Sequence, residues 1–351
     1  MSIGTQSESA SDRMSASDRM SKRVSGGRVG FWLLMGADRR VMAALLTLTV
    51  FAALVGLGAL DPVPLSEAML KSDPAQTLFQ GLTGAIITSV TLVVTLSQLV
   101  LSQEMGPLGD QRRRMEGAMQ FRKDSEDLLD EDVAPPEPSG YLRALISAAE
   151  TRAERLKERA SGDRDADRDL RDYADDLIDN AEKVKGNLEG ANFGTFDVLR
   201  AALDFNYSWK IYQARTLKDD YGEAFAEHVN DTLEELLSVL RALGPTREHI
   251  KTLYFEWTLV DLSRAMIYAA LPALIVCIGS LLFVGTPEGF TGATLGVDDA
   301  LWTVSAAVAI SVSPFSILLS YVLRIATVAK RTLAVSTFVL RETDRTADLD
   351  E

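Results

Sequence analysis

A stripe of small and polar residues repeats at helical spacing between residues 77 and 102. Its members lie alternately four and three residues apart: Thr77, Gly81, Gly84, Thr88, Thr91, Thr95, Gln98 and Ser102. At 3.6 residues per turn they share one face of a helix, and the other faces carry Leu, Ile and Val. Hydroxyl and amide groups are costly to place against lipid, so this polar stripe is expected to face protein or water.

Three uses of the polar stripe remain open. One stripe from each subunit of a ring would line a neutral pore. Alternatively, small residues let two helices approach closely, and Thr or Gln side chains hydrogen-bond across the contact. A small-molecule pocket is the third interpretation.

A weaker serine stripe follows later in the chain. Its members are Ser305, Ala309, Ser313, Ser316 and Ser320. If the two stripes met inside one subunit, their polar side chains could hydrogen-bond to each other. That possibility favours packing over a pore.

Charged residues follow the polar stripe directly. Glu104 and Asp110 precede three consecutive arginines, Arg112, Arg113 and Arg114. In a ring these residues would form an acidic band and then a basic band at the mouth of the pore. A simpler interpretation is that the arginines bind anionic lipid head groups and anchor the end of the helix.

No motif for catalysis is evident in the sequence. It has no Gly-rich phosphate loop ending in Lys-Ser or Lys-Thr, no Gly-x-Ser-x-Gly and no His-Glu-x-x-His. An acidic run from Asp163 to Asp169 is similar to a calcium loop. Arg168 stands where such a loop requires Gly, however, and Ala174 stands where it requires its last ligand. A solvated helix face is the favoured interpretation of this run.

Metal-ligating residues are scarce elsewhere in the chain. The two histidines, His228 and His249, lie on separate predicted helices, and the single cysteine, Cys277, lies in an apolar segment. One cysteine excludes an internal disulfide and a cysteine-based zinc site. We therefore expect neither an enzymatic activity nor a bound cofactor or metal.

Four long apolar segments position the stripes. They run from Val41 to Leu60, from Leu78 to Leu101, from Ala265 to Val284 and from Leu301 to Leu323. About twenty apolar residues allow a helix to cross roughly 30 Å of hydrocarbon, so the sequence predicts an all-α protein with four membrane spans in two hairpins. No ionisable side chain lies at mid-depth in any span, which argues against a proton-coupled transporter.

Lys and Arg are distributed unequally around the predicted spans. Near the span ends one side carries Lys22, Arg23, Arg28, Arg39, Arg40, Arg112, Arg113, Arg114, Arg122, Lys123, Arg247, Lys251, Arg264, Arg324, Lys330, Arg331, Arg341 and Arg345. The other side has only Lys71. The positive-inside rule then predicts a multi-pass protein of the cell membrane with both termini and the middle segment in the cytoplasm. The loops 61–77 and 285–300 are predicted to be external.

The chain outside the spans divides into three parts. Residues 1–38 are rich in Ser, Gly and Arg, contain the direct repeat SASDRM, and are expected to be disordered. Residues 104–263, between the hairpins 39–103 and 264–324, are predicted to form a helical cytoplasmic domain. Residues 325–351 are predicted to be a cytoplasmic tail.

Several helices are expected within the cytoplasmic domain. Their ranges are 110–132, 141–160, 163–185, 195–218 and 223–243. The stretch 134–140 contains three prolines and is predicted to be a linker. Thr195 is the expected N-cap of its helix, and Gly244 and Pro245 are expected to end the last of the five. A further helix from Thr246 should then run into the third span as a rod about 58 Å long.

The chain is strongly acidic. It has a formal net charge of -14, with 29 Asp and 21 Glu, and it uses 26 Arg but only 10 Lys. Molar salt shortens the Debye length to roughly 3 Å and weakens repulsion between carboxylates, so the composition predicts a halophilic source. An ordinary acidic protein is the alternative. We expect no nucleic-acid partner for a surface of this sign.

The segment TLVVTLSQLVLSQEMGPLGDQ, residues 91–111, resembles the end of the membrane hairpin in uncharacterised multi-span proteins of halophilic archaea. The resemblance covers about twenty residues, and it implies membrane placement but no activity.

The sequence therefore predicts a homo-oligomeric, channel-like membrane protein. Its second span would line a neutral pore, and its cytoplasmic domain would assemble or gate the ring. The alternative is a non-conducting membrane scaffold whose cytoplasmic helices bind a partner protein. Membrane lipid and further copies of the chain are the other expected partners.

Overall fold

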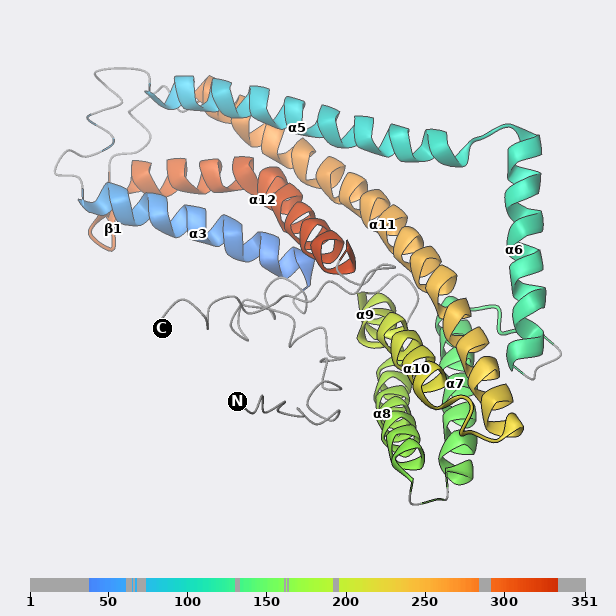
Figure 1. Cartoon of the computed structure of the whole chain (residues 1–351). Coiled ribbons are helices and arrows are strands. Elements are labelled where there is room, and N and C mark those ends of the chain that lie inside the picture. Colours follow the sequence, from blue (N-terminus) through green and yellow to red (C-terminus); the bar gives the residue numbers. More distant parts are fainter. Residues whose placement is uncertain are drawn as a thin grey trace, which may run out of the picture. The chain divides into compact units, whose positions relative to one another are not determined.

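The computed structural model describes residues 38–60, 65, 67, 74–129, 133–160, 162, 164–191, 196–283 and 292–333. These residues are almost entirely helical, so the all-α prediction is confirmed (Figure 1). The predicted disordered segment 1–38 lies outside the described residues except for Asp38, and so does the chain after Leu333.

The helices are α3 (Arg39–Leu60), α5 (Pro74–Glu104), α6 (Leu108–Leu129), α7 (Pro138–Arg159), α8 (Asp165–Leu188), α9 (Phe196–Asp204), α10 (Tyr207–Tyr221), α11 (Glu227–Phe283) and α12 (Asp299–Leu333). The strands are β1 (Ala293–Thr294) and β2 (Val297–Asp298). The described residues form two compact units. The polar unit contains Pro107–Tyr254 and the described residues 329–333, and the apolar unit contains the described residues up to Gly106 together with Phe255–Val328.

Four helices are long and apolar enough to cross a membrane: α3, α5, α11 and α12. Each contains a stretch whose mean hydropathy is 2.0 or higher. Helix α12 extends beyond Leu323, the predicted end of the fourth apolar segment, and continues to Leu333. No Gly or Pro follows Leu323 in that stretch, and its Ala, Lys, Arg and Leu residues favour helix. The first residues of the predicted tail are therefore helical.

The apolar unit is held together by one face of α5 packed against α11 and α12. Phe79 and Ile86 of α5 contact a buried cluster that includes Ala273 and Cys277 of α11 and Val308 of α12. A second cluster continues the seam along the same three helices, and it consists of Val93, Leu262, Met266 and Tyr321. Close packing of these side chains provides the van der Waals contacts that hold the seam together.

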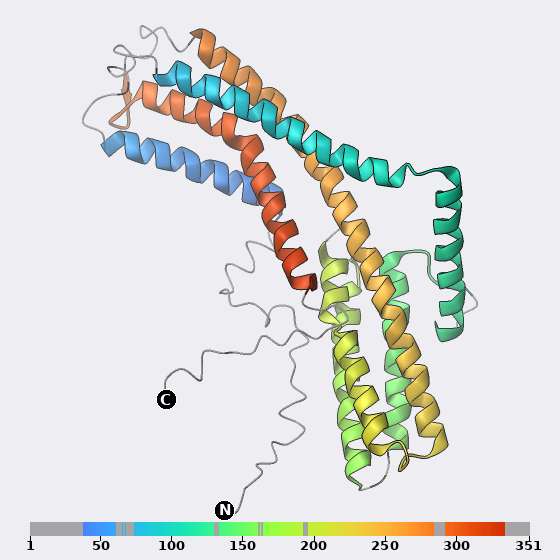
Figure 2. The ribbon, with the colours of Figure 1, turned by 45° about the horizontal axis from the view of Figure 1, so that its top comes forward.

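Helix α3 lies alongside α12 in both ribbon views (Figures 1 and 2). The ring of Phe51 lies 5.9 Å from that of Trp302. At Gly58 the two helices come so close that an added Cβ would lie 2.5 Å from a Leu301 methyl carbon. A larger residue there would force the Leu301 side chain to move, so Gly58 contributes to the close approach of the two helices.

Pro314 lies inside α12, which bends near its middle (Figure 2). Proline has no N–H, so it cannot donate to the carbonyl of Ile310 one turn earlier. The Ser313 hydroxyl donates to that carbonyl instead, at 2.8 Å. Ser313 thus donates to the carbonyl that Pro314 leaves without a donor. Proline is usually tolerated in an apolar helix when a neighbouring group replaces the lost hydrogen bond in this way.

The polar unit is built around α8. Its buried residues recur at spacings of three and four, and they include Leu170, Tyr173, Leu177 and Val184. This face packs against α7, α9 and α10. Helix α6 is attached to α7 through Tyr141, whose hydroxyl donates to Ser125 at 2.5 Å. The predicted helical character of this domain is thus confirmed, and its inner face follows from the amphipathic spacing.

The predicted linker 134–140 and the helix 195–218 both need correction. Helix α7 already begins at Pro138, because a proline in the first turn loses no helical hydrogen bond. The single helix 195–218 is in fact two, α9 and α10, separated at Phe205 and Asn206. The Asn206 side chain accepts a hydrogen bond from the Trp209 backbone N–H at 3.3 Å and caps α10. The predicted N-cap, Thr195, lies outside the described residues.

The predicted break at Gly244 and Pro245 is also wrong. Helix α11 passes through both residues, so the helices 223–243 and 246–284 are one element. Buried residues lie on both sides of the proline, among them Leu240, Leu243 and Ile250. One proline in a helix costs about 3 kcal/mol, and burying these three side chains contributes more than that.

A short hairpin precedes α12 within the predicted loop 285–300. Ala293 pairs with Asp298 and Thr294 with Val297 in antiparallel register. Both turn residues, Leu295 and Gly296, have positive φ, at 55° and 78°. Positive φ at both positions defines the type I′ turn that matches the twist of two short strands.

Candidate functional site

The polar stripe of α5 lies on the surface of the apolar unit. All eight of its residues are exposed: Thr77, Gly81, Gly84, Thr88, Thr91, Thr95, Gln98 and Ser102. The buried residues of α5, Phe79, Ile86 and Val93, are spaced by seven and lie on the opposite side of the helix. The helix therefore contacts α11 and α12 with its apolar side and turns its polar stripe away from its own chain.

The glycines of the polar stripe make no close contact with another helix among the described residues. A Cβ added at Gly81 or Gly84 would meet no atom within 4 Å. Small residues that serve close packing leave no such room, as Gly58 shows on α3. Packing inside one subunit thus does not account for the small size of these residues.

Four hydroxyls of the polar stripe, those of Thr88, Thr91, Thr95 and Ser102, bond to their own helix. Thr88 donates to the Gly84 carbonyl at 2.9 Å, and Thr95 donates to the Thr91 carbonyl at 2.8 Å. Such local bonds satisfy the hydroxyl donor but leave an oxygen lone pair exposed. The amide of Gln98, in contrast, has no hydrogen-bond partner within the described part of the chain. Between its glycines the stripe therefore presents hydroxyl oxygens that can accept a hydrogen bond, together with an amide that has no partner among the described residues.

The serine stripe of α12 has the opposite environment. Ser305, Ala309, Ser316 and Ser320 are buried, and Ser313 is half-buried. The two stripes do not face each other, since one is inside the apolar unit and the other is outside it. Packing among the described residues explains the serine stripe, whereas the polar stripe stays exposed among them.

Sequence reasoning missed one polar contact in the core of the apolar unit. The Cys277 thiol of α11 donates to the Ser311 hydroxyl of α12 at 3.1 Å. Ser311 in turn donates to the Ala307 carbonyl at 2.7 Å. The signal in the sequence is weak, because Ser311 lies outside the stripe at 305–320 and only a structure brings it to Cys277.

The charges predicted at the mouth of a pore pair along α6. Arg112 contacts Glu116 at 2.7 Å, and Arg113 contacts Asp110. These side chains are largely exposed, and such pairs contribute between about 0 and 1 kcal/mol. Arg114 is exposed on the same helix. Glu104 is the last residue of α5, and its side chain lies outside the described residues.

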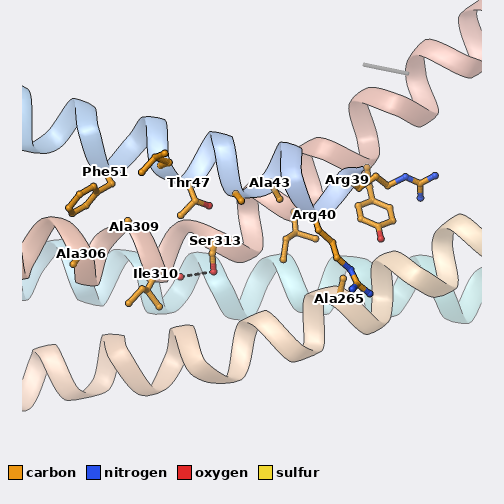
Figure 3. Close-up of a pocket in the computed structure, with 14 residues that line it drawn as sticks. Arg39, Arg40, Ala43, Thr47, Phe51, Ala265, Ala306, Ala309, Ile310 and Ser313 are labelled. Carbon is orange, nitrogen blue, oxygen red and sulfur yellow. Dashed lines mark hydrogen bonds between the residues drawn. The ribbon is translucent and has the colours of Figure 1, made fainter. Parts of the chain in front are cut away.

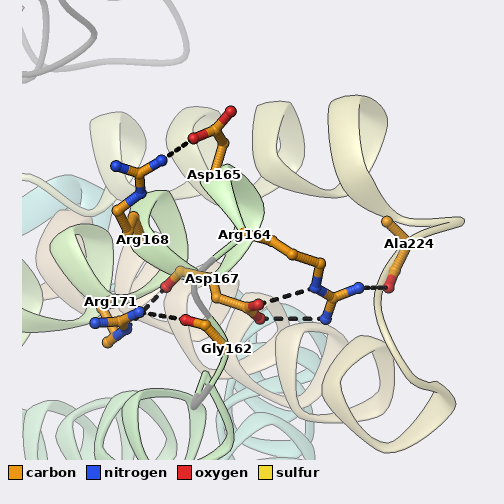
Figure 4. Close-up of polar contacts among 7 residues, drawn as sticks. All are labelled: Gly162, Arg164, Asp165, Asp167, Arg168, Arg171 and Ala224. Carbon is orange, nitrogen blue, oxygen red and sulfur yellow. Dashed lines mark hydrogen bonds and ion pairs between the residues drawn. The ribbon is translucent and has the colours of Figure 1, made fainter.

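The acidic run at the start of α8 is engaged by arginines (Figure 4). Arg164 binds the buried Asp167 carboxylate at 3.0 Å and donates to the Ala224 carbonyl at 3.1 Å. Arg168 pairs with Asp165. These contacts turn the carboxylates away from one another, so they do not converge on a point where a cation would bind.

Asp169 belongs to the same run and accepts a hydrogen bond from the Tyr221 hydroxyl at 2.9 Å. This bond to a carboxylate raises the pKa of the Tyr221 phenol, because the phenolate would lose the bond and face a negative charge. The described residues contain no group of three or more His, Cys, Asp or Glu side chains arranged to hold a metal ion. Asp163 lies outside them.

A family of unknown function (DUF7972) matches residues 5–351, and the chain belongs to this family. No curated protein and no solved structure matches the chain. The comparisons therefore assign no activity to the polar stripe.

Proposed function

We propose that the protein is a multi-pass membrane protein in which copies of the chain assemble around the polar stripe of α5 and enclose a neutral, channel-like pore. The observation that supports this proposal is the position of the stripe. It lies on the exposed side of an apolar helix, opposite the residues that pack within the chain.

A polar stripe at this position needs a polar or protein environment. Thr88 and Thr91 lie near the middle of α5, which would be at the centre of the hydrocarbon core of a bilayer. Leu92 and Leu96 flank the stripe and are exposed, so the helix has an apolar surface for lipid beside its polar one. Such a division of one helix surface is expected when lipid covers one part and a water-filled or protein-filled centre covers the other.

The polar unit would lie in the cytoplasm in this proposal. The support is the excess of Lys and Arg on that side of the four apolar helices, which favours cytoplasmic placement. Helix α11 contributes residues to both units without a break, so the polar unit is joined to the spans by a helix rather than by a loop. A helical connection is suited to an assembly or gating role for the polar unit.

A charge placed at Thr95 tests the pore. If Thr95 faces water, Thr95→Asp leaves the oligomer intact and changes the conductance or ion preference of the protein in planar bilayers. If Thr95 is packed between helices, the carboxylate is buried without a partner at a cost of about 2.5–3.5 kcal/mol, and the oligomer dissociates. Thr95→Val keeps the volume and removes the hydroxyl, so it should lower conductance without changing subunit number.

Leu96→Asp is the matched control, because Leu96 is exposed on the neighbouring face of α5. A carboxylate there would face lipid, so this variant should insert or assemble poorly when Thr95→Asp does not. Absence of conductance in the wild type, together with loss of the oligomer in Thr95→Asp, would refute the channel and favour the non-conducting scaffold.

A further inference from the structure

A groove of about 520 Å³ runs between α3 and α12 in the apolar unit (Figure 3). Small residues form much of its walls, including Ala43 and Ala44 of α3 and Ala306 and Ala309 of α12. Larger apolar side chains lie along it, such as Phe51. Its volume is within the range of about 300–1,000 Å³ found for small-molecule sites.

Two arginines and a tyrosine mark one end of the groove. The guanidinium of Arg39 lies over the Tyr321 ring, 4.6 Å from its centre. Arg40 points along the groove toward Ala265 of α11, and its side chain forms no ion pair or hydrogen bond with the described residues (Figure 3). The nearby Asp38 carboxylate accepts a hydrogen bond from the Arg40 backbone N–H at 2.8 Å. This bond directs the carboxylate to the start of α3.

The length of the groove corresponds to one leaflet of a bilayer. From Arg40 to Phe51 the groove follows α3 for about 16 Å at 1.5 Å per residue. Half of the hydrocarbon core of a bilayer is about 15 Å thick. The arginines would therefore lie at the level of the lipid head groups and Phe51 near the centre of the membrane.

The interior of the groove offers little to a polar ligand. Besides the arginines and Tyr321, its polar side chains are Thr47 and Ser313. The Ser313 hydroxyl is already used, because it donates to the Ile310 carbonyl. A free inorganic anion would leave the apolar walls uncovered, and a polar peptide would bury backbone groups without partners there.

We propose that this groove binds one membrane lipid with an anionic head group. Its phosphate would contact Arg39 and Arg40, and one hydrocarbon chain would lie between α3 and α12. The inference depends on the proposed membrane insertion but not on the pore, since the polar stripe of α5 does not line the groove. Under the proposed orientation the arginines lie at the cytoplasmic leaflet, where anionic lipids attract basic residues.

Native mass spectrometry of the full chain, with phosphatidylglycerol and phosphatidylcholine of identical chains added in turn, tests the site. We expect one phosphatidylglycerol per chain and at least fivefold weaker retention of phosphatidylcholine. Arg40→Gln should weaken phosphatidylglycerol binding about fivefold, equivalent to about 1 kcal/mol for one cation. Arg264→Gln is the matched control, because Arg264 is exposed next to the groove residue Ala265 but does not line the groove.

A second pair of variants tests the apolar part. Ala44 and Ala52 are both exposed on α3, and only Ala44 lines the groove. Ala44→Phe should reduce binding of both lipids by filling the groove, whereas Ala52→Phe should leave binding unchanged. Neither alanine is buried, so both variants should fold.

Four results would overturn the proposal. They are equal retention of the two lipids, equal effects of Arg40→Gln and Arg264→Gln, displacement of the lipid by inorganic phosphate, and lipid binding that appears only when residues 2–36 are deleted. The last result would mean that the chain's own N-terminal segment occupies the groove. The same spectra report the number of subunits, so loss of the oligomer with lipid still bound would count against the pore alone.

Discussion

Removing one side of the contact between Glu150 of α7 and Lys185 of α8 should strongly destabilise the polar unit. The two side chains form an ion pair, and they are only 10% and 24% exposed. Replacing Lys185 by Met leaves the Glu150 carboxylate without a cation in a largely water-free position. Breaking a buried pair from one side costs about 3–5 kcal/mol, and the partial exposure of Lys185 favours the lower end of that range.

The magnitude is large for a domain of this size. A loss of about 3 kcal/mol is a substantial part of the 5–15 kcal/mol by which domains are usually stable. For a unit of about 150 residues it corresponds to a Tm lower by about 6–12 °C. The double variant Glu150→Leu/Lys185→Met removes both charges and should recover most of the loss, because apolar replacements of buried pairs are often neutral.

The assay is urea unfolding of the fragment 108–254, followed by far-UV circular dichroism at several salt concentrations. Lys183→Met is the control, because Lys183 pairs with Asp179 at 3.8 Å on the exposed side of the same helix. That exposed pair should contribute less than about 1 kcal/mol and nothing at molar salt, whereas the buried pair is screened less and its effect should persist. Equal effects of the two lysine variants would refute the reasoning.

Two further predictions concern membrane topology and salt. In a Cys277→Ala background, cysteine at Ser66 or Thr294 should react with an impermeant thiol reagent added to intact cells, and labelling at Ser139 instead would reverse the proposed orientation. The fragment 108–254 should be helical at molar salt and lose helix as salt is diluted, because its carboxylates repel over a longer Debye length. Circular dichroism that does not change down to low salt would remove the argument for a halophilic source.

The four long apolar helices were predictable because they depend on local composition. A stretch of about twenty apolar residues has few alternatives to a helix once it is removed from water, whatever the rest of the chain does. The helices of the polar unit were predictable for a related reason. The buried residues of α8, such as Leu170, Leu177 and Val184, recur at helical spacing and so reveal both the element and its inner face.

The breaks between helices were less predictable, because they depend on tertiary contacts. Gly244 and Pro245 are a strong stop signal in isolation, yet α11 continues through them, because residues on both sides of the proline are buried in the polar unit. The break between α9 and α10 is the reverse case, because the helix ends where the sequence has no strong stop signal. Asn206 is a good N-cap, but it lies in a stretch without Gly or Pro, so only its capping contact with Trp209 identifies the start of α10.

The candidate site combines both situations. The polar stripe of α5 was predictable from residue spacing alone. The sequence left open whether the serine stripe of α12 covers this polar stripe. The residues that decide this are Phe79, Ile86 and Val93, which are spaced by seven and pack toward α11 and α12. A helix in a bundle turns its bulkiest interlocking side chains toward its neighbours, because those contacts gain the most from close packing. Once that seam is assigned to the core of the apolar unit, the polar stripe lies on the opposite, exposed side of α5, and this position is what the proposed assembly depends on.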